Sequence, residues 1–120
     1  MLRPIPIRIL TNSAVLQVPQ TVDRYGETVY TDYNLAKVHI QPTHEVRKST
    51  QDKEVTLNAI LFYDARISVP TLDWGQLQTD ADALNAQMKV VYGGLVYTVQ
   101  GVDLVPDDTG VLHHVEVALV

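Results

Sequence analysis

The chain has 120 residues, with 9 Lys and Arg against 14 Asp and Glu, and a formal net charge of -5. This length fits a single domain over residues 1–120, and the hydrophobic share of 46% is that of a globular core rather than of a disordered chain. The absence of cysteine excludes a disulfide scaffold, a thiolate zinc site and a cysteine nucleophile. The acidic balance argues against binding nucleic acid through its phosphates, which needs clustered Lys and Arg.

Residues 1–12 predict an extended arm. Pro4 and Pro6 fix their own φ angles and keep the residues before them out of the helical region. They also interrupt the apolar positions, so neither a secretory signal nor a membrane-spanning run is expected. We therefore expect a soluble chain that begins with an extended arm.

The next segments alternate between apolar and polar residues, which is typical of half-buried strands. Residues 13–18 predict a strand that Pro19 ends or marks as an edge. A turn around Gly26 leads into a short return strand at residues 28–31, and residues 35–41 predict a further half-buried strand.

Residues 43–53 (THEVRKSTQDK) are polar and carry charges of both signs. Such a segment cannot bury enough apolar surface to order itself alone, so one interpretation is a solvated hairpin loop. The alternative is a functional loop, because loops longer than a hairpin needs often carry function.

Residues 54–64 predict one long strand, since every second residue from Val55 onward is apolar. Its opposite face begins polar and becomes apolar at Ile60 and Phe62. We expect this second half to be buried on both faces, either in a central strand or at a contact between subunits.

The least regular part of the chain lies between residues 65 and 87. Residues 73–75 (DWG) predict a turn. Residues 79–87 have room for one or two helical turns, with Thr79 or Asp80 as the N-cap.

The last third predicts two hairpins. Residues 88–92 and 95–104 flank Gly93-Gly94, a dipeptide favoured in tight hairpin turns, and Gly101 marks a bulge. Residues 111–120 predict the closing strand. The predicted fold class is therefore all-β: a small antiparallel barrel of about six strands with an extended N-terminal arm, a long polar loop and at most one short helix.

Candidate catalytic groups do not form a convincing site. Neighbours on a strand point to opposite faces, so the rings of His113 and His114 are not expected to reach one metal. Turn and cap roles explain the acidic pairs at residues 107–108 and 79–82. No catalytic residue, cofactor or metal is expected, unless the four histidines converge: His39, His44, His113 and His114.

Four segments, taken in order, carry a resemblance to a known family. They are Leu2-Arg3-Pro4-Ile5-Pro6 with Leu10, Asp23-Arg24-Tyr25-Gly26 with Tyr30, residues 91–100 (VYGGLVYTVQ) and residues 112–117 (LHHVEV). Together they resemble the small minor capsid proteins of tailed phages, in the head-completion or head–tail connector group. Val115 stands where that family has an aromatic residue, and residues 65–87 match it poorly.

The resemblance implies a small barrel that forms a homo-oligomeric ring, commonly twelvefold, in the neck of the virion. Such head-closure proteins, or stoppers, contact a portal or adaptor protein above and tail proteins below. They help to retain packaged DNA, which passes through the channel without sequence-specific binding. The family carries no cofactor and no active site, and its members are assembled in the host cytoplasm. A tail-completion or tail-terminator ring, or a small β-barrel binding module, is the alternative.

Two segments are the candidate functional residues under this resemblance. By its position between two strands, the polar segment corresponds to the loop that projects into the channel of related stoppers; its residues are Thr43, His44, Glu45, Val46, Arg47, Lys48, Ser49, Thr50, Gln51, Asp52 and Lys53. The arm has little core of its own and is expected to lie on an adjacent subunit; its residues are Leu2, Arg3, Pro4, Ile5, Pro6 and Ile7.

Overall fold

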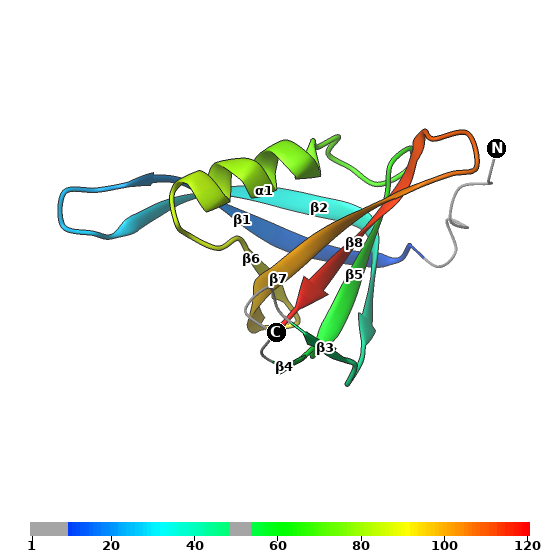
Figure 1. The fold of residues 1–120 in the computed structure, drawn as a ribbon, viewed down its shortest axis with the longest axis horizontal. Coiled ribbons are helices and arrows are strands. Elements are labelled where there is room, and N and C mark those ends of the chain that lie inside the picture. Colours follow the sequence, from blue (N-terminus) through cyan, green and yellow to red (C-terminus); the bar gives the residue numbers. More distant parts are fainter. Residues whose placement is uncertain (1–9, 49–53) are drawn as a thin grey trace.

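The computed structural model of the chain describes residues 10–48 and 54–120. These residues form, in order, β1 (Asn12–Val22), β2 (Thr28–Pro42), β3 (Val46–Lys48), β4 (Glu54–Thr56), β5 (Ala59–Asp64), α1 (Trp74–Ala83), β6 (Lys89–Tyr92), β7 (Leu95–Pro106) and β8 (Leu112–Leu119). Six strands close into an antiparallel barrel in the order β1-β2-β5-β8-β7-β6, whereas β3 and β4 form a separate two-stranded sheet (Figure 1). The predicted small all-β fold with one short helix is confirmed.

The barrel interior holds the hydrophobic core, because alternate side chains of each strand point inward. The core residues that are almost fully buried include Leu16, Leu35, Leu61, Val90, Val115 and Leu119. The helix α1 lies along β1 on the outside of the barrel (Figure 1). Among the described residues, no helix has the length and apolar character needed to cross a membrane.

The strand β2 is one element, although the sequence predicts two strands at residues 28–31 and 35–41. Its first part pairs with β1 as far as Leu35, with one further pair between Val38 and Asn12, and its second part pairs with β5 from Val38 onward. Between them, Lys37 has a φ of 56°, in the left-handed region. This bulge bends the strand, so one continuous segment serves two neighbours.

The strand β1 also extends further than predicted, beyond Pro19 to Val22. Its register with β2 shifts between Pro19 and Thr21, so the proline lies at a bulge rather than at the end of the strand.

The predicted strand 54–64 is interrupted in the structure at Leu57 and Asn58. The N–H of Leu57 donates to the carbonyl of Glu45 at 2.8 Å, whereas the N–H of Asn58 donates to Leu119 at 2.8 Å. The chain therefore leaves the small β3–β4 sheet and enters the barrel at this point. The second half of the predicted strand, β5, is central, but its outer-face residues Ile60 and Phe62 are only half-buried in the single chain. A central strand therefore does not bury both faces, and burial at a contact between subunits stays a prediction.

The helix begins earlier than predicted. Asp73 is the N-cap, and its carboxylate accepts a hydrogen bond from the N–H of Gln76 at 3.1 Å. Residues 73–75 are thus the start of the helix rather than a turn, and Thr79 and Asp80 lie inside it rather than at its cap. Trp74 fixes this start, because its side chain is buried against the Tyr63 ring with the two centroids 5.4 Å apart.

The segment between β5 and α1 has little regular structure, but two side chains hold it. The hydroxyl of Tyr63 donates to the carbonyl of Pro70 and accepts from the N–H of Leu72 at 3.1 Å. The hydroxyl of Ser68 accepts from the N–H of Asp64 at 2.9 Å and donates to the carbonyl of Lys37. These bonds tie the segment to β5 and to the bulge of β2.

The C-terminal predictions are confirmed. Gly93 and Gly94 have φ angles of 60° and 78°, the left-handed values that a two-residue turn between β6 and β7 requires. The register of β7 with β8 shifts between Val99 and Gly101, as expected for a bulge at the glycine.

Candidate functional site

The predicted channel loop is largely a hairpin. Val46 pairs with Thr56, and Lys48 pairs with Glu54, so part of residues 43–53 is strand rather than loop. The small sheet projects from one end of the barrel, between β2 and β5 (Figure 1). Ser49, Thr50, Gln51, Asp52 and Lys53, at its tip, lie outside the described residues.

The base of the β3–β4 hairpin is fixed to the barrel. The N–H of Thr43 donates to the carbonyl of Asn58 at 3.1 Å, and Leu57 beside it is fully buried. Beyond the base, His44 and Glu45 are exposed, and Val46 is 56% exposed. The arrangement is a polar projection on an anchored base, with little packing of its own.

The arm residues Leu2, Arg3, Pro4, Ile5, Pro6 and Ile7 lie outside the described residues. The arm is shorter than predicted, because Leu10 is buried and Asn12 already belongs to β1. The Asn12 side chain accepts from the N–H of Ile40 and donates to the hydroxyl of Tyr92, both at 3.0 Å. The start of β1 is therefore held to both of its neighbouring strands.

The two longest hairpins lie at opposite ends of the molecule (Figure 1), and both carry exposed apolar side chains near their turns. Those on the β1–β2 hairpin are Val22, Tyr25 and Val29, and those on the β7–β8 hairpin are Leu104, Val111 and Leu112. These surfaces were not predicted from the sequence. The sequence does contain one indication of such surfaces, which is that apolar residues stand next to predicted turns. Turns are normally solvated and polar, so apolar residues there are unusual.

Three of the four histidines come close together on one side of the barrel. The Nδ1 atoms of His113 and His114 are 2.7 Å apart, although neighbours on a strand were expected to point to opposite faces. The Phe62 ring lies between His39 and His114, with centroid distances of 5.9 and 6.4 Å. His44 lies apart, before β3.

These histidines do not form a metal site with the groups that the structure describes. Within residues 10–48 and 54–120, no three His, Asp or Glu side chains converge as a metal ion requires. Burial lowers the pKa of His114 below its ordinary value of 6.5, with Glu116 acting in the opposite direction.

The acidic pairs mainly serve local structure. The Asp107 carboxylate accepts from the hydroxyl and N–H of Thr109 and from the N–H of Val111, at 2.6, 2.8 and 3.1 Å. These bonds, led by that of the Thr109 hydroxyl, hold the pKa of Asp107 below its usual range and confirm the turn role. Within α1, Asp80 accepts from the Gln76 amide and Asp82 from the Gln78 amide.

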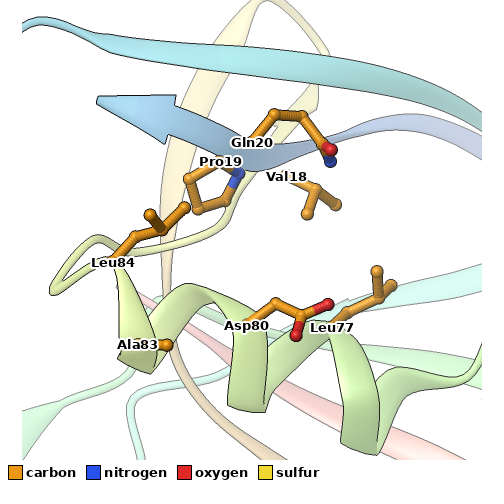
Figure 2. Close-up of a pocket in the computed structure, with 7 residues that line it drawn as sticks. All are labelled: Val18, Pro19, Gln20, Leu77, Asp80, Ala83 and Leu84. Carbon is orange, nitrogen blue, oxygen red and sulfur yellow. The ribbon is translucent and has the colours of Figure 1, made fainter. Parts of the chain in front are cut away.

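A groove of about 290 Å³ lies between α1 and β1 (Figure 2). The residues that line it are Val18, Pro19, Gln20, Leu77, Asp80, Ala83 and Leu84. Its floor is mostly apolar, and Asp80 lies on the helix side. The groove is not predictable from the sequence alone, because it depends on where the helix packs.

Residues 6–119 match the sequence model of a family described as minor capsid protein. A search of curated proteins gives no match. The matched region covers the arm from Pro6 onward, all of the barrel and the small projecting sheet. The chain therefore belongs to the minor capsid protein family and is a structural component of the phage virion.

Proposed function

We propose that the chain is a subunit of a ring in the phage neck, which joins the portal to the tail and helps to retain packaged DNA. The observation that carries the proposal is the β3–β4 hairpin, a two-stranded sheet outside the barrel that projects from an anchored base. The hairpin lies outside the barrel and is not one of the strands that enclose its core. In a ring, copies of the hairpin arranged around the axis would narrow the channel.

The positions of the exposed apolar tips support a ring. Contacts between unlike surfaces close into a ring when the rotation between neighbours closes. The apolar ends of the β1–β2 and β7–β8 hairpins are unlike surfaces at opposite ends of the molecule (Figure 1). Head-to-tail contact would bury both, in a ring that shares the portal's symmetry, commonly twelvefold. A portal or adaptor protein would lie above the ring and tail proteins below it.

The charge of the chain suits passage of DNA. A net charge of -5 disfavours tight phosphate contacts, so a duplex passes through the ring without sequence-specific binding. The hairpin itself can move between open and closed rings, because little internal packing breaks when it pivots at its base.

The test replaces residues 46–56 by Asn-Gly. This keeps the bond between Glu45 and Leu57, which then flank a two-residue turn, and the buried Leu57 stays in place. We expect virions with a complete neck that lose DNA after packaging, measured as nuclease-sensitive DNA. The matched control replaces residues 49–53 by a Gly-Ser segment of equal length. It tests whether DNA retention depends on the length of the hairpin or on the sequence of these residues. Full DNA retention in the Asn-Gly variant contradicts the gate.

The position of the ring has its own test. A photo-crosslinking amino acid at Arg3 or Ile5 in intact virions identifies the neighbouring chains. We expect crosslinks to this chain itself and to portal or adaptor protein. Crosslinks to tail proteins, with none to portal or adaptor, favour the tail-completion or tail-terminator ring instead.

A further inference from the structure

The groove between α1 and β1 has the features of a receptor for an extended segment. On the side of β1 that faces away from β2, β6 pairs only at Val15, Leu16 and Gln17. In the described part of the chain no strand continues along that side from Val18 to Val22. An open strand edge beside an apolar groove accepts extended chains, since backbone groups and alternate side chains find partners together.

The rim of the groove is acidic. Asp80 lines it, and no basic residue lies in the last turn of α1. The C-terminal end of a helix carries partial negative charge, which adds to that of the Asp80 carboxylate. The groove therefore suits an occupant that is apolar on one side and positively charged.

The N-terminal arm has this chemistry. Residues 1–9 (MLRPIPIRI) contain Ile5, Ile7 and Ile9 at alternate positions, together with Arg3 and Arg8 and no acidic residue. In an extended chain these isoleucines share one face. The backbone groups of Ile5, Ile7 and Ile9 also point to one side, whereas Pro4 and Pro6 fall where an N–H would point away from the neighbour. The prolines thus permit pairing on one edge and block it on the other.

The geometry of the groove favours an occupant from another subunit. The groove begins at Val18, six residues into β1 from Asn12, which is about 20 Å at the rise of a strand. An arm that turned back along its own β1 would meet β6, which already occupies that edge at Val15 to Gln17. The Asn12 bonds fix the start of β1 at the opposite end of this strand from the groove.

We propose that the groove between α1 and β1 receives the N-terminal arm of a neighbouring copy of this chain. Ile5, Ile7 and Ile9 lie on Val18, Leu77 and Leu84, and an arginine of the arm lies near Asp80. The inference rests on the ring assembly proposed above and names the surface that holds its subunits together.

The test introduces Ile7→Cys and Ala83→Cys into the full chain, which has no other cysteine. A short bis-maleimide is applied to the concentrated purified protein and to virions. We expect a ladder of crosslinked multimers. Ile7→Cys with Thr71→Cys, an exposed position away from the groove, is the control pair and gives no ladder. A crosslinked monomer shows an arm on its own subunit and overturns the proposal, as does the absence of any crosslink in both samples.

Charge reversal provides an independent readout. Asp80→Lys suits the end of a helix, so the variant folds. We expect it to lower the crosslink yield by up to about fivefold, the factor that one exposed ion pair supplies. Arg8→Glu or Arg3→Glu restores the yield in the double variant. If none of these charge changes alters the crosslink yield, the assigned contact between an arm arginine and Asp80 is contradicted. Loss of the ladder in the Ile5→Asp variant supports the apolar contact between the arm and the groove.

The two proposals fail separately. If the ladder forms but immunogold labelling finds the chain elsewhere on the virion, the arm site stands and the neck ring is wrong. If the chain lies in the neck but no ladder forms, the neck ring stands and the arm site is wrong.

Discussion

The Nδ1 atoms of His113 and His114 lie 2.7 Å apart, with the two rings almost perpendicular. One nitrogen must donate and the other must accept, so the contact needs at least one neutral ring. His114 is the ring whose pKa is lowered, mainly by burial and further by His113, against the opposing effects of Glu116 and Asp64. The pair therefore favours the deprotonated state of His114.

This pair predicts a loss of stability in mild acid. Because the folded-state pKa of His114 lies below its ordinary value of 6.5, the unfolded chain binds more protons as the pH falls below that value. We expect the urea midpoint to fall between about pH 7 and about pH 5. His114→Gln should reduce this slope, whereas His44→Gln, at an exposed position, should leave it unchanged. A slope that His114→Gln does not alter contradicts the prediction.

Tyr63→Phe should destabilise the fold while keeping the ring packed on Trp74. It removes the hydroxyl that joins Pro70 and Leu72 to β5, and leaves their backbone groups without that partner. We expect a loss of about 1–3 kcal/mol in the free energy of unfolding, measured by urea titration. Tyr25→Phe is the control, because Tyr25 is 76% exposed, and a change of about 0.5 kcal/mol or less is expected.

The bulge of β2 should tolerate glycine and reject a β-branched residue. Lys37 is exposed and has a φ of 56°, a conformation that costs most L residues about 1–2 kcal/mol. Lys37→Gly should be at least as stable as the natural chain, and Lys37→Val less stable by about 1–2 kcal/mol in chemical denaturation. Equal stability of the two variants would show that the bulge is not held in this conformation in solution.

Asn12→Ala should loosen the start of the barrel. Its side chain joins β1 to β2 through Ile40 and to β6 through Tyr92. We expect a cost of about 1–2 kcal/mol and faster amide exchange at Ile40, read by hydrogen–deuterium exchange. Tyr92→Phe removes only one of the two bonds and should cost less; an equal cost would mean that the Ile40 bond contributes nothing.

Features that depend on local chemistry were predictable from the sequence. The turn at Gly93-Gly94 and the bulge at Gly101 follow from residues that tolerate special backbone geometry, whatever surrounds them. The start of α1 was not predictable in this way. Residues 73–75 favour a turn locally, and burial of Trp74 against Tyr63 of β5 adds to the Asp73 cap in making them the start of the helix.

Long-range relations account for the remaining differences. The continuity of β2 depends on an exchange of partners from β1 to β5 that no local pattern encodes. The polar segment 43–53 was correctly placed between two strands, but its hairpin form depends on pairing with β4. The groove beside β1 exists only because α1 packs there, so its candidate residues could not be identified before the fold.

The shortness of β6 has a mechanical consequence. This strand closes the barrel through three positions on β1, whereas the β1–β2 ladder runs from Asn12 to Val22. Tension applied across the circumference would unzip the β1–β6 seam before any other. In the proposed ring, a neighbour's arm bound along β1 would hold this seam closed against the pressure of confined DNA.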